Sequence, residues 1–422
     1  MLFIFGPAGT AFEEYQQTMG SEKIDIAIVG GGIGGLAAAA FLRAEGFAPV
    51  VYEQASALTE IGAGLVIAPN AGRQLRRLGV FDHLINRGVR LDVGWEFRRW
   101  KDGSVLSSEN LETACRELYG EHTYTAHRAD LLAALKSAVP ESTVRLGMKC
   151  TSTDFDGDQA VLTFASGEEV RPGLVIGADG VHSVVRRSVV GNVPARESGI
   201  CAFRALIPQS RAPEFATRPA QTLWVGPDHH LVHYPVSGGE FVNLVAFAPS
   251  SASNVESWTA TATTEELAAE FAGWDPRLLS LIEASDTPGR WALLDREPLD
   301  TWNRGHATLL GDAAHPMFPF FAQGAAQAIE DAAVLALCLA DTSTDVATAL
   351  FTYEQIRRPR TTRLQEISHG RSLVNHLPDG EQQEARDHAF SALDPLTDNG
   401  WIYGYDPLGA VAHHRATQAA VP

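Results

Sequence analysis

The feature that constrains this chain most is a run of glycines between an apolar strand and an alanine-rich helix. Residues 24–29 read Ile-Asp-Ile-Ala-Ile-Val, which is typical of a parallel strand covered on both faces. Gly30, Gly32 and Gly35 follow with the spacing G-x-G-x-x-G, and residues 36–43 have the small side chains of a helix that packs closely on a sheet. The segment therefore predicts the first half of a βαβ unit.

A second apolar strand, at residues 49–52, completes this unit and ends at Glu53. In dinucleotide-binding βαβ units the glycines let a pyrophosphate approach the helix N-terminus, and an acid about 20 residues further on binds the ribose. Glu53 stands at about that distance from the glycines. Because a carboxylate there repels a 2′-phosphate, the bound dinucleotide is expected to be FAD or NAD rather than NADP.

Two later apolar strands also end at an acid. Residues 173–178 stop at Asp179, and residues 307–311 stop at Asp312. Ligands of open α/β sheets lie beyond the carboxyl ends of the strands, so we expect these acids to meet Glu53 at one site. An NAD dehydrogenase is not expected to have these two additional acids. They therefore favour FAD over NAD as the bound dinucleotide.

The segments between these acids alternate as antiparallel strands do. Residues 151–171 predict a small β meander that caps the sheet. Residues 222–225, 229–234 and 240–247 predict a second, mostly antiparallel domain with a hairpin at 237–239. One face of that sheet is free to receive a ligand.

The C-terminal part is predicted to be helical. Residues 324–339 read as a helix that returns to the first domain, and a polar helical tail with a kink at Pro359 closes the chain. The length of 422 residues predicts two or three domains at ~150 residues per domain.

Charge and cysteine content exclude several classes of partner. The chain has 33 Lys and Arg against 51 Asp and Glu, and its net charge of −18 disfavours nucleic acids and anionic membrane surfaces. No apolar run is long enough to predict a transmembrane helix. The four cysteines form no C-x-x-C pair, so we expect no disulfide framework, no metal site and a cytoplasmic location.

Two further motifs carry a resemblance to a known family. Residues 179–186 match D-G-x-x-S-x-x-R, and residues 311–316 match G-D-A-A-H-x. With the first glycine motif, they resemble the single-component FAD-dependent aromatic hydroxylases, the group A flavoprotein monooxygenases. Residues 315–326 resemble the branch of salicylate hydroxylase, 3-hydroxybenzoate 6-hydroxylase and 6-hydroxynicotinate 3-monooxygenase. The resemblance covers essentially the whole chain after residue 23.

The resemblance implies an α/β fold: a Rossmann-like FAD-binding domain of the glutathione-reductase type with a β meander, an interleaved, mostly antiparallel substrate domain, and C-terminal helices. We expect a monomer or a homodimer. The expected division is a flexible extension at 1–22, an FAD-binding domain at 23–95, 125–190 and 300–375, a substrate domain at 96–124 and 191–299, and a helical tail at 376–422.

Carried over by motif, the resemblance implies a set of residues that hold FAD. A Gly-Ala turn that opens a helix would place free N–H groups near the flavin ring. The residues alone leave open that Asp179 only caps the next helix and that Arg186 is a surface cation. The implied cofactor-binding residues are Gly30, Gly32, Gly34, Gly35, Glu53, Gln54, Arg128, Asp179, Arg186, Asp312, Pro319, Gly324 and Ala325.

The electron donor is expected to bind only transiently. No second G-x-G-x-x-G follows the first, which argues against enzymes that hold NAD(P)H in its own Rossmann domain, such as disulfide reductases and Baeyer–Villiger-type monooxygenases. The resemblance implies NADH or NADPH as the donor and O₂ as the co-substrate. The oxygen atom would be transferred through a flavin C4a-hydroperoxide.

The strand around residues 229–234 is the best candidate for the substrate surface. Period-two alternation places His230 and Tyr234 on one face, and His229 and His233 on the other. In the resembling enzymes a His and a Tyr with this spacing face the substrate ring, which implies His230 as the base that ionises a ring hydroxyl. The alternative is that His230 is a half-buried histidine with only a structural role in the sheet. The implied catalytic residues are His230, Tyr234, Pro319 and Gln323.

One departure from the family pattern bears on the substrate. Where the hydroxynicotinate enzyme offers a His, this chain has Val66, which favours a hydroxybenzoate over a pyridine. Bulky Trp224, Phe318, Phe320 and Phe321 predict a small ring. A pyridine hydroxylase, a hydroxylase or epoxidase of a larger metabolite, and a flavoprotein that only carries electrons remain the alternatives. The implied substrate-binding residues are Arg204, His230, Tyr234, Val66 and Phe321.

Overall fold

A computed structural model describes residues 25–58, 64–250, 261–392 and 394–419 of the chain. The extension predicted at residues 1–22 lies outside the described residues.

The first glycine motif belongs to a six-stranded sheet in the order β18-β19-β12-β1-β2-β8. All neighbours pair in parallel except β18 and β19. The strand predicted before the glycine motif is β1, and the strands predicted before the three acids are β2, β12 and β19, so the parallel sheet is confirmed. The bounds are β1 (Ile26–Val29), β2 (Val50–Tyr52), β8 (Val144–Arg145), β12 (Leu174–Gly177), β18 (Asn303–Arg304) and β19 (Ala307–Leu309).

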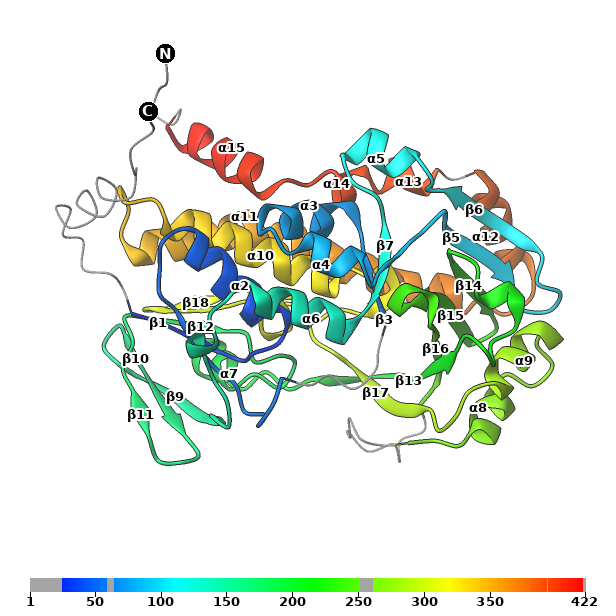
Figure 1. The fold of residues 1–422 in the computed structure, drawn as a ribbon, viewed down its shortest axis with the longest axis horizontal. Helices are drawn as coiled ribbons and strands as arrows, with labels where there is room; N and C mark the ends of the chain where they lie inside the picture. The colour runs from blue at the N-terminus through cyan, green and yellow to red at the C-terminus, as the bar shows by residue number, and fades with distance from the viewer. Residues whose placement is uncertain (1–24, 59–63, 251–260, 393, 420–422) are drawn as a thin grey trace, which may run out of the picture.

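Helices cover one side of this sheet, and a three-stranded sheet with one helix covers the other (Figure 1). Helices α2 (Ile33–Ala44), α6 (Arg128–Ser137) and α10 (Gly324–Leu339) lie on one side. The buried alanines of α2 let it pack closely against α10. The predicted meander lies on the other side with α7 (Val184–Val190), and its strands are β9 (Cys150–Asp156), β10 (Gln159–Phe164) and β11 (Glu169–Val170).

The second large sheet has seven strands in the order β17-β13-β16-β15-β14-β5-β6. It is antiparallel except for β14 and β5, which pair in parallel. Its apolar core includes Trp224 and Leu231 on the sheet and Phe271 beside the covering helices α8 (Thr264–Glu270) and α9 (Pro276–Glu283). The strands are β5 (Val93–Arg99), β6 (Val105–Asn110), β13 (Arg196–Pro208), β14 (Ala220–Gly226), β15 (His229–Val236), β16 (Phe241–Pro249) and β17 (Gly289–Asp295).

A three-stranded sheet in the order β3-β7-β4, which the sequence patterns did not predict, carries Val66. Its strands are antiparallel. The bounds are β3 (Gly64–Ile67), β4 (Val89–Arg90) and β7 (Tyr124–His127), and the nearby helices are α3 (Pro69–Arg77), α4 (Phe81–Ile85) and α5 (Ala114–Tyr119).

The C-terminal part is helical, as predicted. The long helix α11 (Val346–Asn375) contains Pro359, the position of the predicted kink, and continues beyond it. Arg357 of α11 forms ion pairs with Glu330 and Asp331 of α10 at 2.6 and 2.7 Å, and all three side chains are fully buried. The remaining helices are α12 (Glu381–Ala392), α13 (Pro395–Asp398), α14 (Gly400–Tyr403) and α15 (Pro407–Ala419).

Short 3₁₀ turns connect several of these elements, at Glu141–Thr143, Glu214–Ala216, Ser237–Gly239, Gly311–Ala313 and Pro319–Phe321. The division of the chain into domains, with the boundaries given above, stays a prediction. None of the helices in the described ranges combines the length and the apolar character that crossing a bilayer requires.

Candidate active site

A cavity of about 680 Å³ has walls from both large sheets and from β3. The carboxyl ends of β1, β2, β12 and the segment after β19 form one part of its wall, and strands β14, β15 and β16 form another. Many of the residues singled out from sequence line it: Gly30, Gly32, Gly34, Glu53, Gln54, Val66, Arg128, Asp179, Arg204, His230, Tyr234, Asp312, Pro319, Gly324 and Ala325.

The three glycines of the motif serve different purposes. Gly30 has φ of +106°, and a Cβ there would come within 2.4 Å of the Ala178 oxygen. A Cβ on Gly35, which does not line the cavity, would lie 1.9 Å from the Gly30 oxygen, so this glycine permits the helix to approach the strand. A Cβ on Gly32 would meet nothing within 4 Å and would enter the cavity. Gly32 therefore leaves open a space next to the helix N-terminus.

Two helices begin at this cavity without a side-chain cap. Gly32 is the N-cap of α2 and Gln323 is the N-cap of α10, and neither has a side chain that accepts a hydrogen bond from the first N–H groups of its helix. The first turn of each helix also lacks acidic residues. Free N–H groups and the positive end of a helix favour anions. Gly324, at the start of α10, resembles Gly32 in that a Cβ would fill open space.

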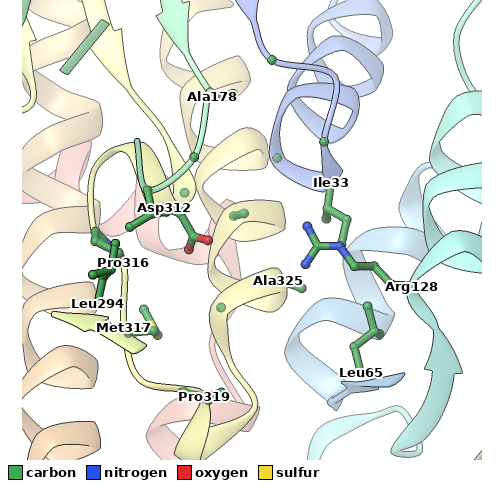
Figure 2. Close-up of a pocket in the computed structure, with 18 of the residues that line it drawn as sticks. Ile33, Leu65, Arg128, Ala178, Leu294, Asp312, Pro316, Met317, Pro319 and Ala325 are labelled. Carbon is green, nitrogen blue, oxygen red and sulfur yellow. The ribbon is translucent and has the colours of Figure 1, made fainter. Parts of the chain in front are cut away.

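Opposite charges stand on facing walls of the cavity. Figure 2 shows the Asp312 carboxylate and the Arg128 guanidinium on opposite sides, both directed inward. Arg128 begins α6, and Asp312 lies in the turn that follows β19. Ala325 lies in the first turn of α10, and Pro319 lies in the turn that precedes this helix (Figure 2). A ligand that spans these walls can donate a hydrogen bond to Asp312 and place an anionic group near Arg128.

Glu53 lines the cavity but is already held by the main chain. One carboxylate oxygen accepts a hydrogen bond from the Gly31 N–H at 2.6 Å, and the other accepts one from Ala55 at 2.7 Å. Each oxygen has a second lone pair, so the carboxylate can still accept from a ribose hydroxyl. The two main-chain bonds fix its position at the end of β2.

The structure supports the capping interpretation of Asp179. Its carboxylate accepts hydrogen bonds from the N–H groups of Val184 at 2.6 Å and Val185 at 3.2 Å, and from the Ser183 hydroxyl. Burial raises the pKa of Asp179 even though these hydrogen bonds lower it. Asp179 therefore fixes the start of α7 while lining the cavity.

Arg186 is neither a surface cation nor part of the cavity wall. Its side chain is buried, and its guanidinium donates to the main-chain oxygens of Val181, Asp312 and Ala313. Burial lowers its pKa to about 10. Arg186 thus joins the motif at residues 179–186 to the motif at residues 311–316 behind the cavity wall. Its predicted contact with the cofactor stays a prediction, and the cavity wall does not include it.

The predicted alternation along β15 is confirmed. His230, Val232 and Tyr234 line the cavity. On the opposite face, Leu231 packs in the core under α8 and α9, and His233 accepts a hydrogen bond from Trp224 Nε1 at 3.2 Å. The strand thus presents one imidazole and one phenol to the cavity.

The His230 ring is held by three other rings. It stacks on Phe247 with ring centroids 4.3 Å apart and contacts the edge of Phe320 at 4.9 Å. Its Nδ1 lies 2.6 Å from Nε2 of His376, so Nε2 is the nitrogen left for a ligand. Burial, then the nearby His376, His229 and Arg371, lower the pKa of His230 well below its ordinary value, so the ring is neutral at physiological pH.

Tyr234 and Arg204 give the same part of the cavity its other polar groups. Burial raises the pKa of Tyr234, so its hydroxyl is a proton donor rather than an anion. The Arg204 guanidinium lies over the ring of Trp291, 4.3 Å from its centroid. Val66 packs in the same apolar cluster as Tyr234. Besides Gln221, the wall there is apolar, with Leu223, Val232, Val245, Phe247, Met317 and Phe320.

Several residues expected at the substrate or the flavin are not on this wall. Phe321 packs with Trp95 and Phe97 behind it, because the turn at Pro319–Phe321 directs it away. The Gln323 side chain accepts hydrogen bonds from Asn70 and Gln327 in the buried polar core. Trp224 and Phe318 are also outside the wall, so only Phe320 of the four bulky aromatics limits ring size there.

The sequence patterns missed some functional candidates. Gln221 lines the cavity from β14, and it directly precedes the strand segment predicted at residues 222–225. His376 follows α11 and reaches His230 across 146 residues. No motif marks it, and only the tertiary fold brings the two rings together. Across the ranges that the structure covers, no three His, Cys, Asp or Glu side chains gather as metal ligands do.

The residues of the cavity fit a flavin dinucleotide. The space beside Gly32 and the uncapped start of α2 suit a pyrophosphate, and Glu53 suits a ribose at the end of β2. The start of α10 supplies a second group of N–H donors for a ring system on the other side. A substrate then has the apolar wall formed by β14, β15 and β16.

Comparisons with known proteins agree with this geometry. Residues 23–368 match the family model described as FAD binding domain. The chain is 41% identical over 387 residues to 3-amino-4-hydroxybenzoate 2-monooxygenase PtnB3 of Streptomyces platensis, covering 91% of this chain and 97% of that protein. It is 36% identical to 6-hydroxynicotinate 3-monooxygenase of Pseudomonas fluorescens, with 92% and 96% covered.

A solved structure shows the same fold. The crystal structure of Klebsiella pneumoniae HpxO complexed with FAD and uric acid superposes with a TM-score of 0.78 at 29% identity, covering 92% of this chain and 96% of that one. The α/β architecture expected from the motifs is therefore confirmed.

Proposed function

The chain belongs to the FAD-binding-domain family that contains the aromatic hydroxylases, and from this premise we propose that it is an FAD-dependent monooxygenase of a small hydroxylated aromatic acid. It uses NADH or NADPH and O₂. The observation that carries the proposal is the cavity itself, in which a neutral buried His230 and the Tyr234 hydroxyl face the same space as two glycine-opened helix starts.

The cofactor is held by residues at the strand ends. Gly32 and the start of α2 accommodate the pyrophosphate, Glu53 binds the adenosine ribose, and Arg128 and Asp312 flank the middle of the dinucleotide. Bound FAD supplies hydride acceptance from the donor and activation of O₂ for transfer of one oxygen atom. The N–H groups at Gly324 and Ala325 stabilise negative charge on the ring.

His230 prepares the substrate for attack. An aromatic carbon reacts with an electrophilic oxygen more readily when a ring hydroxyl has lost its proton. The neutral His230 has a lone pair on Nε2 with which to take that proton, since Nδ1 is engaged by His376. Phe247 and Phe320 hold the imidazole in one orientation, so that its Nε2 atom stays directed toward the substrate.

The substrate class is a carbocyclic hydroxybenzoate. The Tyr234 hydroxyl and Arg204 offer a donor and a cation for its carboxylate, and the walls of Val232, Val245 and Phe247 suit an uncharged ring. Val66 supplies no hydrogen bond to a ring nitrogen, which disfavours a hydroxypyridine. The similarity to the 3-amino-4-hydroxybenzoate enzymes makes an amino-substituted hydroxybenzoate the first compound to test.

The test is the oxidation of NADH and NADPH in air by the FAD-loaded enzyme, with hydrogen peroxide quantified alongside. The panel contains 3-amino-4-hydroxybenzoate, salicylate, 3-hydroxybenzoate and 6-hydroxynicotinate. One benzoate is expected to accelerate oxidation with little peroxide. Acceleration by 6-hydroxynicotinate alone would refute the carbocyclic class, and indifference to every acid would favour a larger substrate or a pure electron carrier.

We also propose a division of the chain into two domains and a location in the cell. The substrate domain is the seven-stranded sheet with α8 and α9, and the six-stranded sheet with its helices is the FAD domain. All four cysteines are buried and free, which supports a cytoplasmic location. The enzyme is a monomer or a homodimer.

A further inference from the structure

His230 is hydrogen-bonded to a second histidine, His376, which has no role in the chemistry proposed above. Nδ1 of His230 and Nε2 of His376 are 2.6 Å apart, and the two ring centroids are 4.8 Å apart. One nitrogen must donate a proton and the other must accept it, because two neutral imidazoles can share a hydrogen bond in no other way. The cavity imidazole therefore has a proton-accepting or proton-donating neighbour on its far side.

His376 lies between His230 and the surface. His230 is only 2% exposed, whereas His376 is partly exposed. His376 directly follows α11, and its main-chain oxygen accepts a hydrogen bond from the Asp228 N–H at 3.0 Å. Asp228 has φ of 58° in the turn before β15, so the turn and the helix end hold each other. The imidazole pair thus spans from the cavity wall to the solvent side of β15.

From this geometry we propose that His376 is a relay residue that carries the substrate proton from His230 to solvent. The inference rests on the proposed role of His230 as the base. It assigns to His376 a positioning and proton-transfer role, without contact to substrate or cofactor.

The relay is balanced in atoms and charge. The substrate O–H bond breaks and an Nε2–H bond forms on His230. The Nδ1–H bond of His230 breaks and an Nε2–H bond forms on His376. His376 then releases its Nδ1 proton to water. When a hydroxyl of the product is reprotonated, the same steps run in reverse and restore both tautomers.

Burial, more than the neighbouring charges, keeps the pair in the neutral form that a relay needs. Burial and, to a smaller extent, His229 lower the pKa of His376 to about 4, although the nearby Asp228 acts to raise it. His376, His229 and Arg371 face His230 and oppose its protonation. Above pH 5 both rings therefore have a lone pair available, and a transferred proton leaves readily toward solvent.

A structural role for His376 makes a different prediction from a relay. Glutamine at this position can still accept the His230 Nδ1–H, since its side-chain oxygen is an acceptor. It cannot take the proton and pass another one on. His376→Gln therefore retains the hydrogen bond and removes only the transfer.

The experiment measures proton release when 3-amino-4-hydroxybenzoate binds to the oxidised, FAD-loaded enzyme without an electron donor. Stopped-flow absorbance of phenol red in weakly buffered solution reports the proton, and the perturbation of the flavin spectrum reports binding. In His376→Gln, binding is expected at the original rate while proton release slows by ~10²-fold. In His376→Ala, added imidazole is expected to restore fast release.

The matched control is His229→Gln. His229 is adjacent in sequence, but its Nε2 lies 3.2 Å from Glu270 on the other face of β15. Its loss is expected to leave the release rate within about twofold of the original enzyme, because it has no path to the cavity. A slowing equal to that of His376→Gln would overturn the relay in favour of a general electrostatic effect.

The remaining outcomes separate the relay from the proposed function. Unchanged release in His376→Gln, with none in His230→Gln, would overturn the relay and retain His230 as the base. If the unaltered enzyme binds the ligand but releases no proton, the base role of His230 fails, and the relay fails with it. Slow release in His376→Ala that imidazole does not restore would also overturn the relay.

Discussion

The Arg186 guanidinium donates to the main-chain oxygen of Ala313 across 3.0 Å, joining two motifs that lie 127 residues apart in sequence. The same side chain also donates to the oxygens of Val181 and Asp312. An arginine suits this position because its five N–H groups can donate to several main-chain oxygens together. The cavity wall at Asp312 is therefore positioned by a residue that does not line the cavity.

Replacing this arginine should weaken the fold and the cofactor site together. Arg186→Met keeps the length of the side chain but leaves three main-chain oxygens, of which that of Ala313 is in a buried bond, without their donor. We expect a loss of about 3 kcal/mol in the free energy of unfolding and weaker FAD binding. Urea unfolding and FAD titration measure the two effects. Arg187→Met, at the exposed neighbouring position, should change stability by less than ~0.5 kcal/mol.

The glycines of the first motif predict two separable defects. A Cβ on Gly32 meets nothing within 4 Å, so Gly32→Ala should fold normally but lose FAD affinity by about tenfold or more, which corresponds to ~1.4 kcal/mol. A Cβ on Gly35 would lie 1.9 Å from the Gly30 oxygen, so Gly35→Ala should destabilise the protein itself. Thermal unfolding with and without FAD distinguishes them. Equal destabilisation of the apoprotein by both variants would contradict this division.

Glu109 predicts a pH dependence of stability. The side chain is buried, and neither carboxylate oxygen has a hydrogen-bond partner among the residues that the structure describes. Burial, with Asp394 and Asp398 nearby, raises its pKa to about 8. Between pH 4.5, its ordinary pKa, and pH 8 the folded state holds a proton that the unfolded state has lost, so this group lowers stability as pH rises.

Glu109→Gln removes that cost. The variant should be more stable than the original protein by about 3 kcal/mol at pH 7, and the difference should largely vanish at pH 4.5. Urea unfolding at both pH values measures this. Glu112→Gln, an exposed neighbour, should leave stability unchanged at either pH. A gain that is the same at both pH values would show that ionisation of Glu109 is not the cause.

Tyr234 should affect substrate binding more than stability. Tyr234→Phe keeps the ring packed against Val66 and Val236 but removes the hydroxyl that is proposed to bind the substrate. We expect KM for the aromatic acid to rise about tenfold, which corresponds to ~1.4 kcal/mol, with unfolding unchanged. Tyr353→Phe is the contrasting control. It removes a buried bond of 3.0 Å to the Leu309 oxygen and should cost ~1 kcal/mol of stability without changing KM.

The parts of the fold that sequence could predict are those with a local physical signature. Continuous apolar runs predicted the parallel strands, and period-two alternation correctly placed His230 and Tyr234 on one face of β15. These patterns depend on which face of an element is buried, and a sequence records that directly. They therefore identified the wall of the cavity that carries the imidazole.

What sequence could not predict depends on contacts between distant segments. Arg186 faces inward because its three acceptor oxygens come from two loops, and nothing near it in sequence indicates this. Phe321 is turned away by the 3₁₀ turn that begins at Pro319, although Phe320, its neighbour, lines the cavity. His376 meets His230 only through the tertiary fold. A motif marks a segment, but it does not orient each side chain within it.

The measurement that tests the central claim most directly is incorporation of isotopically heavy dioxygen into the aromatic acid, followed by mass spectrometry, for the FAD-loaded enzyme and for His230→Gln. We predict one heavy oxygen atom in each product molecule. In His230→Gln, NAD(P)H oxidation should continue, with most of the oxygen released as hydrogen peroxide, because the ring is no longer ionised. Product without label, or equal labelled product from both proteins, would contradict the assignment of a hydroxylase whose base is His230.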